Sequence, residues 1–507
     1  MNVLLFSMPD VSPMFPPKAW VPPQIGIASL AGNTTDHEVF CADLIARRED
    51  VAAGVREAMA RVKPRLVGLS SMSFQYATAL KVAELVKSID PTVPLVLGGY
   101  HATVLYDVIA AEERGGRLFD YLVRGEGETA FNALVHAVDA NKGFESVAGL
   151  SWKRGGGWVH NERGPLEDLT KIKLPKRSAR IWADDCFFRG LQPSGKSGAF
   201  WAGLLKQGFD VVETSRGCTM VCNFCSIAHM YGRSFRTYSI DRVMADIADS
   251  KAHGAKWIVF ADDNITLDVG RFEALCDAIV AHGHDDVRYI VQASSTGIST
   301  TERLVAKMAR AGIGVAFLGI ESVSERNLAR MKKGNIIERT RTAVRWLRKH
   351  KILVVGGMVL GLPDDEPSDI EANYRYFSEM NVDFYGDQIA TPYPRTGMRE
   401  DYEREGLITN PDDFRFYSGF WANVRSKHLT SDEIQFLRWK CRRKYTSGVP
   451  LPPTLRASLS VFAVVRTAFY APVRGLWRRL KAWDKTERQL YDEEMARARK
   501  ANNFFPE

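Results

Sequence analysis

Three cysteines stand close together in the segment RGCTMVCNFC, which runs from Arg216 to Cys225. Cys218, Cys222 and Cys225 have the spacing C-x3-C-x2-C. Three thiolates at this spacing can each bind one iron of a cubic iron–sulfur cluster. The fourth iron then has no protein ligand and is free to bind a small molecule. The motif therefore predicts a cluster that takes part in chemistry as well as carrying electrons.

A structural zinc site and a chance grouping of core cysteines are the alternatives for this segment. Zinc needs four ligands, and His229 follows closely enough to be the fourth. Zinc motifs usually consist of two ligand pairs, however, and the sequence has no second pair here. The other cysteines are isolated, so we interpret them as small apolar residues and expect no disulfide framework: Cys41, Cys186, Cys276 and Cys441. A reducing compartment fits this pattern.

The composition is that of a soluble globular protein. The chain has 507 residues, enough for about three domains, with 45% apolar and 25% charged residues. Its opening residues lack the basic start of a signal peptide, and no run approaches the ~20 apolar residues of a membrane-spanning helix. These features predict a cytoplasmic protein. The net charge of +8 is weak evidence for an anionic partner, and no nucleic-acid partner is expected.

The chain from residue 208 to residue 398 alternates short apolar runs with amphipathic helical patterns such as Ile240–Ala252 and Val269–Ala281. The predicted strands are Phe209–Ser215, Trp257–Ala261, Tyr289–Ala293, Val315–Ile320, Leu353–Val359 and Phe384–Ala390. Such alternation predicts parallel strands joined by helices. Six units are too few for a closed eight-stranded barrel. We therefore expect a partial (β/α)6 barrel with its mouth at the carboxyl ends of the strands.

Polar residues follow several of these strands, and an aromatic residue, Phe224, precedes the last cysteine of the motif. Asp262 comes after the second strand, Ser294 ends the third, and Glu321 follows the fourth. Together with the cysteine spacing, this order closely resembles the radical S-adenosylmethionine (SAM) enzymes. In that family SAM chelates the open iron, and an electron from the cluster splits SAM into methionine and a 5′-deoxyadenosyl radical.

The resemblance implies a [4Fe–4S] cluster, SAM, and an external reductant such as flavodoxin or ferredoxin. It assigns the cluster to the three cysteines and SAM contacts to Phe224, Asp262, Ser294 and Glu321. For each of these last residues a structural role is the alternative. An aspartate after a strand, for example, often caps the next helix.

Residues 1–140 predict a separate parallel sheet, because short buried-strand patterns alternate with helical ones. Ser70 ends one predicted strand, and Gly98 and Gly99 end another. Ligands of such sheets bind at the carboxyl ends of the strands, where glycines let a large ligand approach the backbone.

The order of these pieces resembles the cobalamin-binding domain that precedes many radical SAM domains. The segments that carry the resemblance are Gly98-Gly99-x-His101-x-Thr103 and Arg124-Gly125-Glu126-Gly127-Glu128. It implies a cobalamin held near Ser70, Gly98 and Gly99. The motif D-x-H-x-x-G, whose histidine binds cobalt in this family, is absent, since Asp36-His37 lacks its spacing. A sheet of the same fold that covers the substrate and binds no cobalamin is the alternative.

Two further regions complete the predicted organisation. Residues 141–207 form a connector with a hairpin, and residues 399–507 form a mainly helical C-terminal region that ends in a basic amphipathic tail. Between Arg456 and Lys485 there are seven basic residues and one acidic residue. Basic residues beside Trp, Phe and Leu suit the surface of an anionic membrane, although a helix packed on the protein's own core is an equal alternative. Membrane contact would suggest a lipid substrate, such as an isoprenoid or a hopanoid.

The sequence as a whole indicates an α/β enzyme: a Rossmann-like cobalamin-type sheet, a partial radical SAM barrel and a helical C-terminal region. By resemblance, its reaction is the methylation of an unactivated carbon, on a small molecule or a lipid. In this scheme the deoxyadenosyl radical removes a hydrogen atom, methylcobalamin donates the methyl group, and a second SAM restores it. The alternatives are a radical cyclisation, oxidation or carbon–carbon coupling like that of tetrapyrrole ring-forming relatives, a cobalamin-free radical SAM reaction, and a non-enzymatic iron–sulfur or zinc scaffold.

Overall fold

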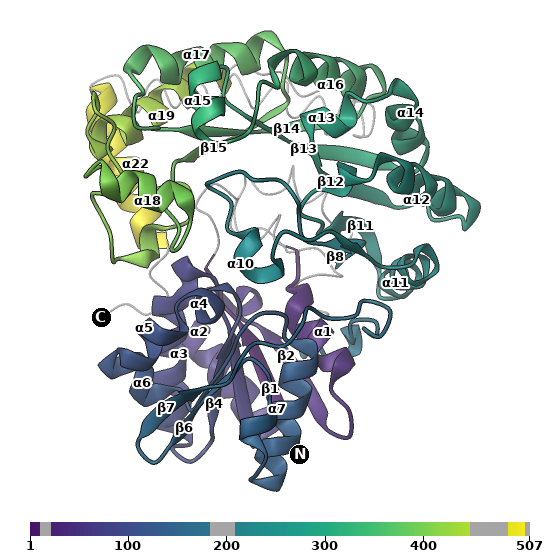
Figure 1. Cartoon of the computed structure of the whole chain (residues 1–507), viewed down its shortest axis with the longest axis vertical. Coiled ribbons are helices and arrows are strands. Elements are labelled where there is room, and N and C mark those ends of the chain that lie inside the picture. The colour runs from purple at the N-terminus through teal and green to yellow at the C-terminus, as the bar shows by residue number, and fades with distance from the viewer. Residues whose placement is uncertain (11–21, 183–207, 447–484, 502–507) are drawn as a thin grey trace.

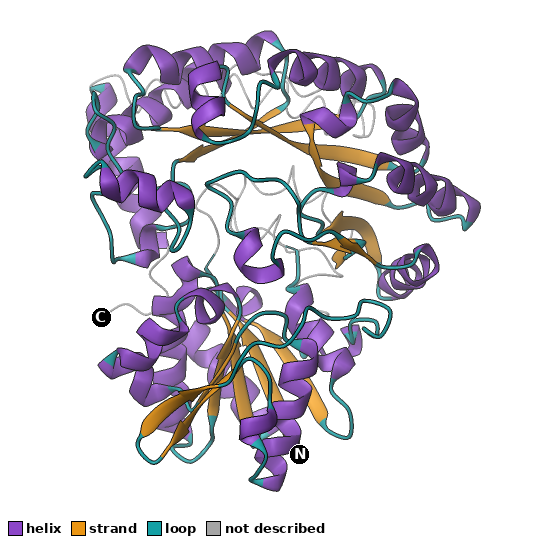
Figure 2. Cartoon of the chain, in the orientation of Figure 1, coloured by secondary structure: helices purple, strands orange, loops and turns teal. Residues whose placement is uncertain are grey.

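The computed structural model describes residues 1–10, 22–182, 208–446 and 485–501, and it contains two large sheets. Figure 1 shows the sheets in separate halves of the molecule, with the short helix α10 (Ile227–Tyr231) between them. Helices cover both faces of the N-terminal sheet and the outer face of the second, as Figure 2 shows. The fold is α/β, as predicted.

The N-terminal sheet has the strand order β2-β1-β3-β4-β5-β6-β7. Its parallel strands are β1 (Asn2–Ser7), β2 (Glu38–Asp43), β3 (Leu66–Ser70), β4 (Leu95–Gly98) and β5 (Tyr121–Val123). The hairpin of β6 (Leu150–Arg154) and β7 (Gly157–His160) continues the sheet in antiparallel pairing. The hairpin predicted for the connector therefore belongs to this sheet, while the boundary at residue 140 stays a prediction.

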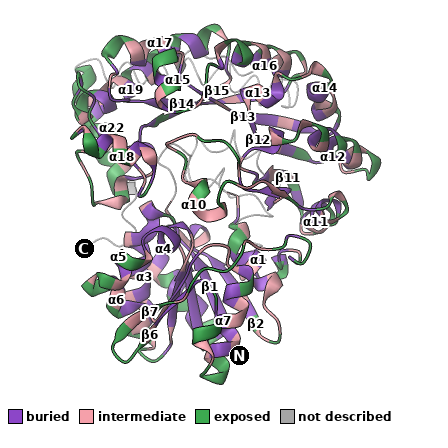
Figure 3. Cartoon of the chain, viewed as in Figure 1, coloured by how far each residue is buried: buried purple, intermediate pink, exposed green. Residues whose placement is uncertain are grey.

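Two apolar cores lie on opposite faces of this sheet. Helices α1 (Ile25–Asn33) and α7 (Glu128–Ala140) contribute to one, and α2 (Val51–Val62) and α3 (Tyr76–Ile89) to the other. The strands are accordingly buried, as Figure 3 shows, which explains their continuous apolar runs. β1 lies between β2 and β3, so the chain passes from β1 to its neighbour on one side and then crosses to its neighbour on the other side. Such a switch point leaves a crevice at the carboxyl ends of the strands.

The second sheet contains six parallel strands in the order β15-β14-β13-β12-β11-β8. They are β8 (Gly208–Val212), β11 (Ala255–Phe260), β12 (Arg288–Ser294), β13 (Ile313–Glu321), β14 (Leu353–Leu360) and β15 (Phe384–Ile389). The outer helices include α11 (Ile240–Ala252), α12 (Val269–Ala281), α14 (Glu302–Arg310), α16 (Ile337–Lys349) and α17 (Pro367–Glu379). The sheet curves into an open half-barrel, so the prediction of a partial barrel is confirmed.

The described parts of the C-terminal region are mainly helical, with mostly loops and turns over residues 405–430. It contains α18 (Gly397–Arg404), α19 (Ser431–Thr446), which contacts α17 and β15, and α22 (Glu487–Ala501), which contacts α19. The predicted membrane-contacting tail, both its apolar run and all of its basic residues except Lys485, lies outside the described residues. Among the residues that are described, no helix has the length and apolarity needed to cross a bilayer.

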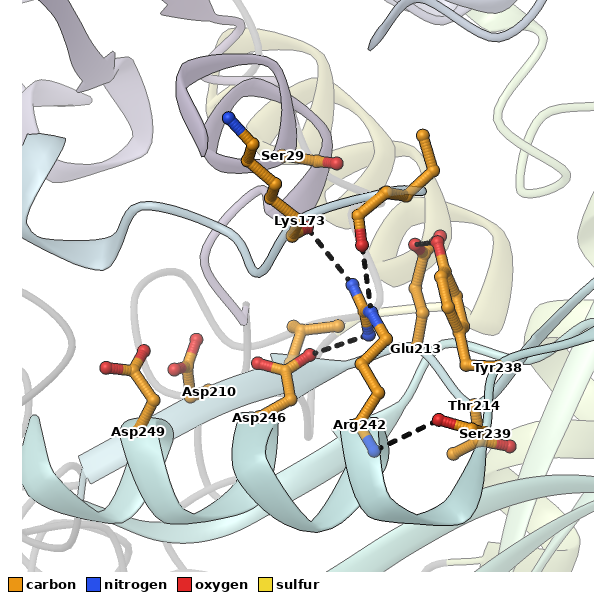
Figure 4. A network of polar contacts seen from close by, with 12 residues as sticks. Ser29, Lys173, Asp210, Glu213, Thr214, Tyr238, Ser239, Arg242, Asp246 and Asp249 are labelled. Carbon is orange, nitrogen blue, oxygen red and sulfur yellow. Dashed lines mark hydrogen bonds and ion pairs between the residues drawn. The ribbon is translucent and has the colours of Figure 1, made fainter. Parts of the chain in front are cut away.

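A buried charge network fastens the connector to the half-barrel. Arg177 has no exposed side-chain surface; it pairs with Asp210 and donates to Asp246 at 2.7 Å and to Asp249 at 2.8 Å. The guanidinium of Arg242, on α11, donates to the carbonyl of Lys173 at 3.2 Å, which holds the same stretch of connector (Figure 4). The connector is thus part of the packed structure.

We expect Arg177→Met to lower the free energy of unfolding by about 3–5 kcal/mol, because the substitution leaves buried carboxylates without their cation. Chemical denaturation followed by circular dichroism measures this change. Arg65→Met is the control, since the pair Arg65–Asp139 is 64% and 40% exposed and should contribute less than about 1 kcal/mol. Equal unfolding midpoints for the two variants would contradict the expectation.

Candidate active site

The cysteine loop follows the short strand β9 (Ser215–Arg216) at the mouth of the half-barrel. Gly217 precedes the first cysteine with φ +89°, and a Cβ atom there would lie 2.3 Å from the carbonyl oxygen of Ser234. Glycine is therefore required at this position. The three cysteines line a cavity of about 530 Å³ together with the carboxyl ends of the strands.

Asn223, inside the cysteine loop, ties it to the surrounding helices. Its backbone N–H donates to the carbonyl of Met331 at 3.2 Å, and its carbonyl accepts from Met398 N–H at 3.0 Å. Its side-chain amide donates to the carbonyl of Arg330 at 3.0 Å and to Asp401 at 3.1 Å. These bonds hold the loop between the end of α15 (Glu325–Arg330) and the start of α18.

Burial raises the pKa of all three thiols, that of Cys225 to about 11, while the nearby Lys333 acts in the opposite direction on Cys218 and Cys222. A thiol with a raised pKa loses its proton when a metal cation binds it, and iron would supply that cation here. Among the described residues no three His, Cys, Asp or Glu side chains converge on one point as ligands of a single metal ion. A cubane has a different requirement, because each thiolate binds a different iron. The residues present therefore fit a [4Fe–4S] cluster.

Three residues predicted to contact SAM line the same cavity: Phe224, Ser294 and Glu321. Glu321 adopts φ +66° at the end of β13 and accepts a hydrogen bond from Lys333 at 2.9 Å. Gly319 leaves room for this ion pair, since a Cβ there would lie 2.8 Å from the Glu321 carboxylate. Ser294 Oγ accepts from Gly297 N–H, so this serine also caps the helix that follows it.

Asp262 lies behind the cavity wall, and its neighbour Asp263 lines the cavity. Asp262 is 2% exposed and accepts hydrogen bonds from the hydroxyls of Thr214, at 2.9 Å, and Ser215. Burial raises its pKa to about 7. Asp263 accepts from Gly217 N–H at 2.9 Å, and burial raises its pKa to about 6. The structure thus gives Asp263 the position that the sequence suggested for Asp262.

A second cavity, of about 170 Å³, lies at the carboxyl ends of the N-terminal strands. Ser70, Gly98 and Gly99, the residues predicted to bind cobalamin, line it. The nearest neighbour of a Cβ built on Gly98 is the carbonyl oxygen of Val123 at 3.9 Å, so the glycine leaves open space. Near these strand ends Ser71 Oγ and His101 Nδ1 are buried, with no hydrogen-bond partner among the described residues. The bare backbone at Gly98 would let a ligand approach the carboxyl ends of these strands closely, as the predicted cobalamin would require.

From the acidic segment Asp262-Asp263-Asn264 after the second predicted strand, sequence reasoning selected Asp262 as the site residue, and it missed Lys333. Which of two adjacent side chains faces the cavity depends on the local direction of the backbone, which composition does not give. Lys333 lies in a Lys-Lys-Gly turn that belongs to no motif we recognised. A basic residue 12 positions after Glu321 was the available signal, and it is weak.

Comparison with known families places both cavities in recognised domains. The model of the radical SAM superfamily matches residues 212–377, and that of the B12 binding domain matches residues 21–135. The first match contains the three cysteines and the second contains Ser70, Gly98 and Gly99.

Two named proteins and one solved structure are similar to most of this chain. The chain is 29% identical to the uncharacterized methyltransferase PH0819 of Pyrococcus horikoshii, over 90% of this chain and 94% of that protein. It is 25% identical to the anaerobic magnesium-protoporphyrin IX monomethyl ester cyclase of Rubrivivax gelatinosus, over 85% and 78%. The solved structure of TsrM, a radical SAM methyltransferase from Kitasatospora setae with cobalamin and a [4Fe–4S] cluster bound, superposes with a TM-score of 0.61, at 20% identity over 81% of this chain and 76% of that one. The last similarity shows the shared fold.

Proposed function

Since the chain belongs to the radical SAM superfamily and carries a B12-binding domain, we propose that it is a cobalamin-dependent methyltransferase acting on an unactivated carbon. The domains imply a [4Fe–4S] cluster, SAM and cobalamin. Cobalamin supplies methyl-transfer chemistry when bound, and the cluster with SAM supplies a radical that removes a hydrogen atom. Membership of this superfamily favours an enzyme over the non-enzymatic iron–sulfur or zinc scaffold that the sequence left open.

The observation that carries this proposal is the position of α10. We call the cavity lined by the three cysteines the cysteine cavity and the one lined by Gly98 and Gly99 the glycine cavity. Residues 227–229 of α10 line the cysteine cavity, while Met230 and Tyr231 line the glycine cavity. A single short helix, which follows the third cysteine directly, therefore separates the two cofactor cavities. A substrate carbon held near α10 would be accessible from both sides, as a reaction that uses both cofactors requires. The protein's task would be to hold that carbon and exclude water.

The contribution of the individual residues follows from their positions. The cysteine loop would hold the cluster, and Asp263, Glu321 and Phe224, which line the same cavity, would present two carboxylates and an aromatic face to SAM. The buried ion pair with Lys333 fixes the orientation of Glu321, so that its carboxylate is already in place when SAM binds. Gly98 and Gly99 keep the opposite cavity open to cobalamin.

The products of SAM separate methylation from the alternatives. A methyltransferase of this type converts SAM into both S-adenosylhomocysteine and 5′-deoxyadenosine, and formation of the first should depend on added cobalamin. Anaerobic incubation with a reductant, followed by liquid chromatography and mass spectrometry, measures both. Deoxyadenosine without any cobalamin-dependent S-adenosylhomocysteine would favour the second candidate, a radical cyclisation. The similarity to the Rubrivivax gelatinosus cyclase supports that candidate.

We expect Asp263→Asn to weaken SAM binding roughly 10- to 150-fold, because it removes a charged hydrogen-bond acceptor worth about 1.5–3 kcal/mol from the cavity wall. Asp262→Asn should change SAM affinity by no more than a few-fold, since that side chain lies behind the wall. Isothermal titration of SAM into cluster-loaded protein measures both affinities. The reverse order of effects would return the SAM contact to Asp262, as the sequence first suggested.

For the substrate we propose a lipid or another apolar molecule reached at a membrane surface, on the evidence of the basic C-terminal sequence. Each basic residue near an anionic surface contributes on the order of 1 kcal/mol, an attraction that salt weakens. The protein should sediment with anionic vesicles in low salt, and Arg478→Glu combined with Arg479→Glu should reduce this binding. Binding that is equal for both proteins would leave the lipid proposal without support.

A further inference from the structure

A buried cluster of opposite charges joins the start of α7 to the strands around the cysteine loop. We call it the clamp, and its members are Glu126, Glu128, Glu213, Arg216 and Arg236. The side chains of Glu126, Glu128 and Arg216 are 4%, 6% and 6% exposed. Two of the carboxylates come from the B12-binding side of the molecule, and both arginines come from the ribbon of β9 and β10 (Arg236–Thr237) beside the cysteines.

Arg216 is the centre of this cluster. Its guanidinium donates to Glu126 at 2.9 Å, to Glu128 at 2.6 Å and to Glu213 at 2.8 Å. Arg236 donates to Glu126 at 3.0 Å and so adds a second arginine contact across the same boundary. One planar fork thus engages carboxylates from both halves of the chain, which a lysine with a single point charge cannot reproduce.

Arg216 lowers the pKa of Glu128 in spite of its burial. Burial alone would raise the pKa of Glu128, yet Arg216 and the Ser29 hydroxyl, which donates at 2.7 Å, hold it below its usual value. Glu213 is supported in turn by Tyr238, whose hydroxyl donates to it at 3.3 Å. Arg242 lies over the Tyr238 ring at 3.8 Å, an arrangement visible in Figure 4. The charges are therefore held in one geometry from several sides.

The clamp connects directly to both cofactor cavities. Arg216 is separated from Cys218 by Gly217 alone, so a displacement of its backbone reaches the first cysteine. Glu126, Glu128 and Arg216 themselves line the glycine cavity. Arg163, whose guanidinium lies next to Gly125, donates to the carbonyls of His229 and Met230 in α10 at 3.1 and 3.0 Å. The contacts that join the two halves thus border the cavities in which the two cofactors would lie.

We propose that the clamp sets the separation between cobalamin and the iron–sulfur cluster, with Arg216 as the positioning residue. This inference rests on the proposed function, because it assumes that both cofactors bind. The separation between the two cofactors has a large effect on catalysis, since displacing reacting groups by about 1 Å can cost roughly 10²-fold in rate. The Glu-x-Glu pair at the start of α7 is then a structural link between cofactors, in addition to forming part of the cavity wall.

Pulsed electron paramagnetic resonance tests the separation without any substrate, because cob(II)alamin and the reduced cluster each carry an unpaired electron. Arg216→Lys and Glu128→Gln should lengthen or broaden the measured distance distribution by about 1 Å or more in those molecules that carry both cofactors. Arg348→Lys is the matched control. Arg348, on the outer helix α16, donates to the carbonyl of Asn381 at 2.6 Å and to Asp383 at 2.9 Å, away from the clamp, so its replacement should leave the distance unchanged. An unchanged distribution in both clamp variants would overturn the proposal.

Hydrogen exchange provides a second measurement, which needs no cobalamin. In the clamp variants the start of α7 and the cysteine loop should both exchange at least about tenfold faster, and in Arg348→Lys neither should. If the unaltered protein binds no cobalamin, the proposed function fails, and coupled exchange of the two segments still shows the mechanical link on which the inference depends. Faster exchange in one segment without the other would contradict the link.

Discussion

Replacing the three cysteines of the loop with alanine is expected to remove both the cluster and all reductive cleavage of SAM. Anaerobically reconstituted protein should hold about four irons and four sulfides per chain, because three thiolates and SAM complete a cubane. The triple variant of Cys218, Cys222 and Cys225 should hold less than about one. Its 5′-deoxyadenosine should fall to the level formed without enzyme, since the electron that splits SAM is expected to come from the cluster.

The control for this prediction is Cys276→Ala. Cys276 is fully buried in α12 and belongs to the apolar core, so its loss should leave iron content and deoxyadenosine formation unaffected. Circular dichroism should confirm that the triple variant keeps its helices and strands. Continued deoxyadenosine formation by the folded triple variant would refute the assignment of the cluster to this loop.

Filling the glycine cavity at Gly98 is expected to weaken cobalamin binding. A leucine at this position would project into the space that the cavity provides, because the nearest atom to a Cβ there is 3.9 Å away and the backbone needs no change. Overpacking of this kind costs about 1–3 kcal/mol, or roughly a 5- to 150-fold increase in the dissociation constant. Titration with hydroxocobalamin, followed by its visible absorption, measures the change.

Gly98→Leu is a cleaner test than a substitution at Gly99. Gly99 has φ +90°, and a Cβ there would lie 2.8 Å from the carbonyl oxygen of Ser71, so any side chain would strain the backbone as well. Gly270→Leu, on the exposed start of α12, is the control and should bind cobalamin with unchanged affinity. Equal affinities for Gly98→Leu and the unaltered protein would show that cobalamin, if bound, does not approach this strand end.

Much of the fold could be predicted because buried parallel strands leave a continuous apolar signal. The runs around Leu95–Gly98 and Leu353–Leu360 became strands at nearly the expected positions, and two helices of the half-barrel have the expected bounds. Strand β2 (Glu38–Asp43) was not predicted, because it carries acidic residues at both ends. The hairpin was expected, but its addition to the N-terminal sheet depends on pairing between β5 and β6, which local sequence does not encode.

The candidate site was predictable to the extent that it is local in sequence. The cysteines share one loop, and their spacing carries the chemistry. Asp263, in contrast, is distinguished from Asp262 by the direction in which each side chain leaves the backbone. The clamp is less predictable still, since Arg216 is 90 residues from Glu126 and 88 from Glu128. Contacts of that kind arise when the two halves pack together, and a single sequence contains no pattern that specifies them.

The most direct test of the account follows the methyl group of SAM. Protein loaded with a full cluster and cobalamin is incubated anaerobically with a reductant and SAM that carries a deuterated methyl group, and the corrinoid and nucleoside fractions are analysed by mass spectrometry. The account predicts a deuterated methyl group in the corrinoid fraction and 5′-deoxyadenosine in the nucleoside fraction, with the first reduced in Gly98→Leu and the second lost in the triple cysteine variant. Deoxyadenosine without any label in the corrinoid fraction, from protein that has cobalamin bound, would contradict methyl transfer and favour a radical reaction of another kind.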